Sequence, residues 1–406
     1  MTKPAPRKPA PWARPAERSA QLTALRNAKM TTSAHAYVRG SVGEFYDWLA
    51  RAEGLAVPEG PPVWICGDCH VGNLGPVGSV KGVIDIEVRD FDQSVIGNPA
   101  HDLLRLGLSL AMAARASDLP GVTTAHMLEQ MMIGYAEAFD ELSEDRDSDV
   151  PELVRLALRE AAGRSWKHLA DERIEGTAPT IPLGKRFWPL ERAERDAVQA
   201  LFAEEEMRRL VTALRSRDDD AAIKVLDAAY WRKGCSSLGL LRLAVLVEVE
   251  VDGGAAATHC LIDIKEAVAP APPHPRDARM PRDNAERVVE GARHMSPHLG
   301  NRMLARRLMD KAVFVRELLP QDLKLEIETF TRAQAMSVAR FLAKVVGRAH
   351  ARQMGTLDGG SWIEELQRSH SKRLDAPSWL WTGVVELVGP HERAYLEHCR
   401  RYALAA

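Results

Sequence analysis

The spacing of apolar residues predicts helices near both ends of the chain, with strands between them. Residues 21–54 carry apolar positions at helical spacing, most clearly in "HAYVRGSVGEFYDWLA". The short runs "VWICG" and "KGVIDIEVRDF" are rich in Val and Ile and predict two buried strands. Asp102 is a candidate cap for a helix over "LLRLGLSLAMAARA", and residues 123–142 predict a second long helix.

The pattern changes from helical to strand-like near residue 229. "LLRLAVLVEVEV" and "THCLIDIKEA" lie on either side of the turn "DGG", and together they predict a β-hairpin. The following "VAPAPPHPRDARMPRDN" is too rich in proline for regular structure. A helix is then predicted from about residue 284, followed by the strand "KAVFVREL" and a long helix over residues 332–352. The expected fold class is α+β, with one β-rich segment between two largely helical blocks.

Composition and pattern together divide the chain into four parts. The first, "MTKPAPRKPAPWARPAERSA", is basic and rich in proline, and it lacks the apolar run of roughly 7–15 residues that a signal peptide needs. We therefore predict a disordered basic tail there. The predicted parts are a tail over residues 1–20, a helical lobe over 21–228, a β-rich lobe over 229–320 and a helical return over 321–406.

The overall charge narrows the class of partner. The formal net charge is −2, which gives no reason to expect binding to nucleic acid or to an anionic membrane. No segment approaches the ~20 apolar residues of a membrane helix. The expected location is the cytoplasm and the expected ligand is a small molecule, while a protein partner stays open.

The stretch "WICGDCHVGNLG" allows two unrelated interpretations, of which the first is a haem or metal site. Cys66, Cys69 and His70 have the spacing of a c-type haem attachment site, and the same residues are potential zinc ligands. Haem attachment requires export, and no second Cys/His pair follows at zinc-finger spacing. The odd count of five cysteines also argues against a disulfide framework. The favoured interpretation makes both cysteines small buried residues beside a functional turn.

The second interpretation is a phosphoryl-transfer site, which needs a base, metal ligands and a cradle for phosphates. Asp68 can accept a proton from a substrate hydroxyl, and Asn73, five residues on, can offer an amide oxygen to Mg²⁺. Asp90-Phe91-Asp92 follows a predicted strand, as the metal-binding Asp-Phe-Gly of kinases does, with Asp in place of Gly. Asp90 and Asp92 are therefore candidate metal ligands.

Two further motifs supply a phosphate cradle and a lysine. "GCSSLG" matches the kinase pattern G-x-G-x-x-G except that Ser236 replaces the middle glycine, and backbone N–H groups of such a turn bind phosphate. Lys265, late on the next predicted strand, corresponds to the lysine that contacts the phosphates. Its carboxylate partner is expected on the following helix, where Glu286 and Glu290 lie one turn apart.

The order of these motifs is that of a kinase cut before the catalytic loop and rejoined elsewhere. A circular permutation explains this order, because a fold needs contacts in space and not in sequence order. "GDCHVGN…RDFDQSVIGNPAHDLLRL" resembles the aminoglycoside and choline phosphotransferases, with Cys66 in place of a usual His and Asn98 in place of an Asp. Over residues 25–400 the chain also resembles a bacterial domain-of-unknown-function family.

The resemblance implies a protein-kinase-like, two-lobed, circularly permuted fold that binds ATP and Mg²⁺. It makes Asp68 the base, with His70 supporting the loop, and it places the adenine against the backbone of a hinge strand at Glu317 and Leu318. Arg39 and Arg316 are candidate phosphate or substrate contacts. The nucleotide-binding candidates are Gly234, Ser236, Ser237, Gly239, Lys265, Glu286, Glu290, Glu317 and Leu318, and the metal candidates are Asn73, Asp90 and Asp92.

Three functions follow from this set of motifs. The leading expectation is an ATP- and Mg²⁺-dependent phosphotransferase acting on a small-molecule hydroxyl. Ser236 and Asp92, which replace glycines, favour a nucleotide-binding pseudokinase that senses or scaffolds. Transfer of the nucleotide onto a protein is the third, because kinase-like folds can bind ATP reversed.

Overall fold

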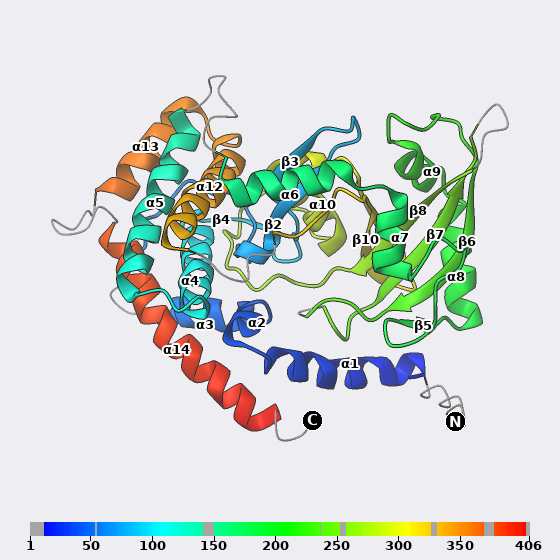
Figure 1. Ribbon diagram of the computed structural model, residues 1–406, viewed down its shortest axis with the longest axis horizontal. Coiled ribbons are helices and arrows are strands. Elements are labelled where there is room, and N and C mark those ends of the chain that lie inside the picture. The colour runs from blue at the N-terminus through cyan, green and yellow to red at the C-terminus, as the bar shows by residue number, and fades with distance from the viewer. Residues whose placement is uncertain are drawn as a thin grey trace.

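A sheet lies at one side of the molecule and a bundle of helices at the other (Figure 1). The computed structural model describes residues 12–52, 55–140, 150–235, 237–251, 257–325, 331–368 and 377–402. The fold is mixed α+β, and every pair of neighbouring strands is antiparallel. Among the described helices, none is long and apolar enough to cross a membrane.

Within the described residues the sheet has six strands, of which a central hairpin and one neighbouring strand were predicted. Its strands, in spatial order, are β5 (Phe187–Pro189), β6 (Ile223–Trp231), β7 (Arg242–Val249), β8 (Thr258–Glu266), β10 (Lys311–Leu318) and β9 (Met303–Leu308). The hairpin β7–β8 and the strand β10 confirm the sequence-based predictions. The predicted boundary at residue 229 is wrong, because β5 and most of β6 precede it. Both strands are short or interrupted by polar residues, so their alternation is weak in the sequence.

The two faces of the sheet have different character. On the face we call outer, Leu243 and Val245 of β7 pack under α8 (Arg192–Phe202) and α9 (Glu205–Thr212). The inner face carries charged residues at one end and apolar residues at the other. The helix α7 (Trp166–Ile174), which follows α6 (Glu152–Gly163), covers the apolar end.

Helices from distant parts of the chain form the other side of the molecule. They are α4 (Ala100–Ala116), α5 (Gly121–Asp140), α12 (Arg332–Ala351), α13 (Thr356–Gln367) and α14 (Ser378–Tyr402). Helices α5 and α12 approach closely at Gly134, where an added Cβ would lie 2.0 Å from the Arg340 carbonyl oxygen. The helix predicted to be capped by Asp102 begins at Ala100 instead, and Asp102 lies buried inside its first turn.

Two small ribbons lie between the helices and the sheet. One pairs β1 (Val63–Ile65) with β4 (Val95–Gly97), and the other pairs β2 (Leu74–Gly78) with β3 (Ile84–Val88). The segment between β1 and β2 contains the predicted catalytic loop, and Asp90 follows β3. The remaining helices, α10 (Asn284–Met295) and α11 (Pro297–Gly300), come between β8 and β9.

The first described helix corrects the predicted tail. Helix α1 (Pro15–Met30) begins inside the expected disordered stretch, with Pro15 at its first position, and α2 (Ala34–Val38) and α3 (Val42–Arg51) follow. Arg18 is buried and donates two hydrogen bonds to Glu194 of α8. Residues 15–20 are therefore structured because a buried carboxylate pairs with their arginine, while residues 1–11 lie outside the described part.

Candidate functional site

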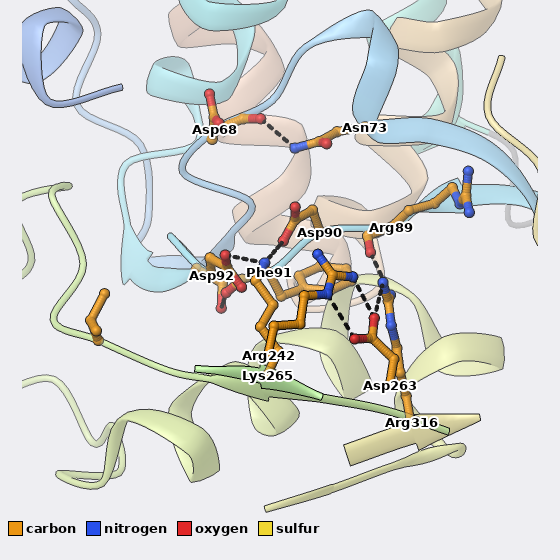
Figure 2. A network of polar contacts seen from close by, with 12 residues as sticks. Asp68, Asn73, Arg89, Asp90, Phe91, Asp92, Arg242, Asp263, Lys265 and Arg316 are labelled. Atoms are coloured by element: carbon orange, nitrogen blue, oxygen red, sulfur yellow. Dashed lines mark hydrogen bonds and ion pairs between the residues drawn. The ribbon is translucent and has the colours of Figure 1, made fainter. Parts of the chain in front are cut away.

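A cavity of about 140 Å³ lies between the inner face of the sheet and the loop after β1. Most predicted catalytic and phosphate-binding residues face it, although they come from segments far apart in the chain. The predicted residues that line it are Arg39, Asp68, His70, Asn73, Asp90, Gly234, Ser237, Lys265, Arg316 and Leu318. Figure 2 shows Asp68 and Asn73 on one side of Asp90, with Lys265 and Arg242 on the other.

The loop that carries Asp68 depends on glycine at position 67. Gly67 has a φ of +74°, and an added Cβ there would lie 2.2 Å from the Gln93 carbonyl oxygen. A residue with a side chain would therefore be strained and would collide with backbone. The backbone N–H groups of Cys66 and Gly67 both donate to the carboxylate of Asp102, at 2.8 and 2.9 Å. The helix α4 thus fixes the loop through one buried acid.

A buried chain of polar side chains supports Asp102 from behind. His350 of α12 lies 3.3 Å from the Asp102 carboxylate, and its other ring nitrogen is 2.9 Å from the Tyr135 hydroxyl. Trp362 Nε1 donates to the same hydroxyl at 3.0 Å. All four side chains are buried, so each polar group needs the partner that it has. The chain connects α4, α5, α12 and α13 behind the loop.

Asp68 is buried and faces the cavity. Its Oδ1 accepts a hydrogen bond from Arg105 Nε at 2.9 Å, and its carbonyl accepts one from Asn73 Nδ2 at 2.9 Å. Burial raises the pKa of the Asp68 carboxyl to about 6, although Arg105 opposes this rise. A carboxylate with this pKa is ionised at neutral pH and is a stronger base than an exposed aspartate.

Asp90 and Asp92 hold Lys265 between them. Lys265 Nζ is within hydrogen-bond distance of Asp92 Oδ2 and 3.5 Å from Asp90 Oδ1. Burial opposes ionisation of Asp90, but Lys265 and Arg316 outweigh it and keep the pKa of the Asp90 carboxyl well below its usual range. Burial, with Asp90 nearby, raises the pKa of Asp92.

The glutamates expected to hold Lys265 do not do so. Glu290 pairs with Arg293 one turn along α10, at 2.5 Å, and Glu286 has no ion pair with a described residue. Helix α10 contributes Arg287 instead, which donates to the backbone carbonyls of Asp92 and Val268. The acids that neutralise Lys265 therefore come from the segment after β3 and not from the helix.

The charged end of the inner face contains a second ion-pair system. Arg242 of β7 donates to both oxygens of Asp263 of β8, at 2.8 and 2.5 Å, and Arg316 of β10 lies 3.5 Å from the same carboxylate. Asp263 is fully buried, and despite that burial its two arginines keep its pKa well below its usual range. The ion pairs of Asp263 with Arg242 and Arg316 thus form the side of the cavity that the sheet provides.

Cations outnumber acids around the cavity. Its cationic lining residues are Arg39, Arg89, Arg173, Lys233, Arg242, Lys265, Arg316 and Lys324, against Asp68, Asp90 and Asp322. Burial, together with Arg242 and Arg173, lowers the pKa of Lys233 well below its usual value. Burial, with Arg39 and Arg89 nearby, lowers the pKa of Lys324 to about 8. Burial is the larger cause of both shifts and the neighbouring cations add to it, and a bound polyanion would oppose both effects.

The predicted phosphate loop reaches the cavity with only part of its length. Gly234 has a φ of +100° and lines the cavity with Ser237, which lies close enough that a Cβ on Gly234 would collide with its hydroxyl. Gly239 faces α1 instead, where an added Cβ would lie 3.2 Å from Thr23 Oγ1. Ser236 falls outside the described residues.

The residues of the predicted adenine contact, Glu317 and Leu318, are both buried. Leu318 packs with Leu246 and Leu261 on the apolar end of the inner face, beneath Leu169 and Ala170 of α7. The Glu317 side chain pairs with Arg217 at 2.7 Å, and its carbonyl accepts a hydrogen bond from Arg302 at 2.9 Å. The strand β10 therefore lines the cavity through Arg316 and Leu318, and α7 packs beside Leu318.

The residues around the cavity fit a metal that arrives with its ligand. Within the described part of the chain, no three His, Cys, Asp or Glu side chains come together as a metal site. Asn73 and Asp90 nevertheless offer hard oxygens to the same cavity. Mg²⁺ is usually held by one or two carboxylates plus phosphate oxygens and waters, which matches this small set. Asp92 is engaged with Lys265 and does not line the cavity.

Comparison with known proteins places the whole of this architecture in one family. A family model described as an uncharacterized protein conserved in bacteria (DUF2252) matches residues 18–401. The chain belongs to this family. The match runs from α1 to the end of α14, so the DUF2252 region contains both the sheet and the helical side. No curated protein and no solved structure matches the chain.

Several cavity residues of this DUF2252 chain were missed by sequence reasoning. Arg242 and Asp263 could have been found, because each interrupts an apolar strand and falls on the same face as Lys265. Lys233 directly precedes the predicted phosphate loop and could also have been identified from the sequence. Arg89 and Lys324 carry no pattern of their own, and only the fold brings them to the cavity.

The two cysteines of the DUF2252 loop are packed in its interior. Cys66 and Cys69 are both fully buried in the main hydrophobic core, which confirms their interpretation as small buried residues. The hydrogen bond with Cys69, and then burial, raises the pKa of the Cys66 thiol, whereas for Cys69 the same hydrogen bond opposes a rise that burial causes. Neutral buried thiols are poor nucleophiles, so their contribution is to the packing behind Asp68.

Proposed function

We propose that the protein is a phosphotransferase that moves the terminal phosphoryl group of ATP to a hydroxyl of a small molecule. The observation that carries this proposal is the convergence of Asp68, Asn73, Asp90 and Lys265 on one cation-rich cavity. These are the residue types that phosphoryl transfer needs, namely a base, oxygen ligands for a metal and a cation for phosphate oxygens. The excess of cations over acids gives that cavity a preference for a polyanion.

The arrangement of elements supports a kinase-like fold with permuted order. Lys265 lies on the third of three consecutive long strands, after a glycine-containing turn between the first two, and a helix follows it. Kinases place their lysine on the third strand after such a loop. Here these elements follow the Asp68 loop and Asp90 in the chain, whereas in kinases they come first. We therefore extend the proposal to a circularly permuted, two-lobed kinase-like fold.

Each residue has a specific part in the proposed reaction. Asp68 takes the proton of the acceptor hydroxyl while the hydroxyl oxygen of the acceptor bonds to the terminal phosphorus of ATP. The bond from that phosphorus to the bridging oxygen breaks, and ADP is released. Lys265 and Lys233 offset the negative charge of the phosphates. Asn73 and Asp90 would hold Mg²⁺, which when bound neutralises phosphate charge.

The first prediction is that MgATP binds and that binding requires Asp90. We expect titration calorimetry to detect binding of MgATP to the wild type. Asp90→Asn should lower the affinity for MgATP at least tenfold because a metal ligand is lost. At about 100 times the dissociation constant, the ligand should stabilise the folded wild type by roughly 2.7 kcal/mol. The matched control is Asp196→Asn on the exposed side of α8, which should bind as the wild type does.

Labelled ATP then separates transfer from binding alone. Terminal-phosphate label should move to an acceptor or to water, and Asp68→Asn should slow this by about 10²–10⁴-fold while leaving MgATP binding intact. Binding without any turnover would support a nucleotide sensor instead, and transfer of α-phosphate label would support nucleotidyl transfer. Absence of nucleotide binding in the wild type would refute the proposed function.

A further inference from the structure

Two pairs among the cations around the cavity have different surroundings. Lys265 and Arg242 stand on the sheet and are already neutralised by Asp92 and Asp263. Arg39 and Lys324 stand on the opposite side, with the Asp68 loop, and no described carboxylate forms an ion pair with either. The second pair is therefore a concentration of positive charge that the described protein does not balance.

The position of Arg39 is set by the loop itself. Arg39 ends the short helix α2, and an added Cβ on Gly72 would lie 3.7 Å from its Nε. Gly72 lies between His70 and Asn73, so this guanidinium is beside the loop that carries Asp68. The cation is therefore on the side where the proposed reaction requires the acceptor hydroxyl.

Lys324 and Lys29 approach the same space from other elements. Lys324 belongs to the segment after the hinge strand, which is attached to β2 because Leu325 N donates to the Leu74 carbonyl at 3.3 Å. Lys29, in the last turn of α1, donates to the Gly234 carbonyl at 3.2 Å at the entrance of the phosphate loop. Burial is the main cause of the lowered pKa of both lysines, and the charge of Arg39 adds to it.

The acids that face this group are already engaged. Asp68 accepts from Arg105, Asp90 is beside Lys265, and Asp322 forms a bidentate pair with Arg302 at 2.9 and 3.1 Å. A ligand that enters here with a negative group would therefore meet cations whose charge is not yet paired within the described protein. A guanidinium with two lysines suits a phosphate dianion better than a single carboxylate.

We propose that Arg39 and Lys324, assisted by Lys29, form the acceptor subsite and that the acceptor is a phosphorylated alcohol. This inference rests on the proposed function, because that function fixes which side of the cavity is the acceptor side. The phosphate group of the acceptor binds Arg39 and Lys324 and presents a separate hydroxyl to Asp68. Asp68 takes the hydroxyl proton, the oxygen bonds to the terminal phosphorus of ATP, and ADP leaves with the electron pair of the broken bond.

The test uses glycerol 3-phosphate as a probe on the full chain saturated with Mg²⁺ and a non-hydrolysable ATP analogue. Saturation blocks the donor phosphate positions, so the probe can bind only elsewhere. We expect calorimetry to detect glycerol 3-phosphate but not glycerol. Arg39→Gln and Lys324→Gln should each weaken the probe at least tenfold and change the affinity for the analogue less than twofold. Arg192→Gln, on the exposed face of α8, is the matched control and should change neither.

The outcomes separate the inference from the function beneath it. The acceptor assignment is wrong, and the proposed function stands, if the analogue binds but glycerol 3-phosphate does not. The same holds if glycerol 3-phosphate binds both variants as tightly as it binds the wild type. Equal weakening of analogue and probe by Arg39→Gln would assign Arg39 to the donor and overturn the inference. If the analogue itself fails to bind the wild type, the proposed function fails first, and the acceptor assignment falls with it.

Discussion

At the scale of single residues, the environment of Asp68 couples the proposed chemistry to stability. Burial raises the pKa of its carboxyl from 3.8 to about 6, so the folded chain holds this proton more tightly than the unfolded chain does. The free energy of unfolding must therefore fall as the pH rises through this interval, and it stays lower above it. Two pKa units correspond to roughly 3 kcal/mol.

The prediction is that Asp68→Asn escapes this loss because an amide does not ionise. Relative to the wild type, the free energy of unfolding of the variant should rise by roughly 2–3 kcal/mol between pH 4 and pH 7. Urea titrations at both pH values measure this difference. Asp196→Asn, whose side chain is exposed, should show no such rise. Parallel pH dependence in Asp68→Asn and the wild type would contradict the prediction.

Residue spacing predicted the chemical groups of the site better than their partners. The interval from Asp68 to Asn73 is local, so a short motif was enough to select it. The partner of Lys265 was assigned to α10 by analogy, whereas the structure pairs it with Asp92, 173 residues away in the chain. Long-range ion pairs leave no periodic signal in one sequence, and such a pairing therefore needs the fold.

At the scale of elements, α7 is the feature that the sequence did not place. Its residues have helical spacing, but nothing in them shows that Leu169 and Ile174 pack on the inner face of the sheet beside Leu318. The hairpin β7–β8 and the strand β10 were predictable because each is long and rich in apolar residues that favour strands. Strand β5 has only three residues, which is too few for a pattern.

The position of α7 leads to a prediction about nucleotide binding. If the base of ATP binds on the inner face where Leu318 packs under α7, it must displace α7, and the measured affinity then includes that cost. Leu169→Ala weakens the packing of α7, so it should tighten ATP binding severalfold and leave the binding of inorganic tripolyphosphate unchanged. Calorimetry with both ligands measures the difference.

The control for Leu169→Ala is a leucine-to-alanine substitution that leaves a similar cavity on the outer face of the sheet. Leu201→Ala removes a buried leucine of α8 from the outer face of the sheet. Both substitutions should cost about 2–5 kcal/mol of stability, but only the change in α7 should alter ATP affinity. If ATP and tripolyphosphate respond alike to Leu169→Ala, the base does not contact the surface under α7.

At the scale of the whole molecule, α1 spans from the sheet to the helical side (Figure 1). Near its start, Arg18 pairs with Glu194 at 2.5 Å, donates to the Pro189 carbonyl and stacks on the Tyr230 ring. Near its end, the Thr31 carbonyl accepts a hydrogen bond from Tyr395 of α14. The helix thus holds the two sides together next to the proposed acceptor subsite.

Removing one partner of the buried pair Arg18–Glu194 should lower the free energy of unfolding strongly, whereas replacing both partners with apolar residues should lower it little. Arg18→Ala leaves the Glu194 carboxylate buried without its partner, and we expect a loss of about 3–5 kcal/mol in urea unfolding. The double variant Arg18→Met with Glu194→Leu removes both charges and should recover most of that loss. Equal stability of the single and double variants would show that the ion pair is not what attaches α1.

The hydrogen bond from His350 to Asp102 has a consequence for synthesis on the ribosome. The two residues are 248 positions apart, and Asp102 is the acid that fixes the backbone before Asp68. At about 5–20 residues per second, the loop emerges tens of seconds before α12 can support it. For most of its translation, a nascent chain therefore contains Asp68 without the contact from His350 that supports Asp102. Truncated products that end before α12 should be inactive for that reason.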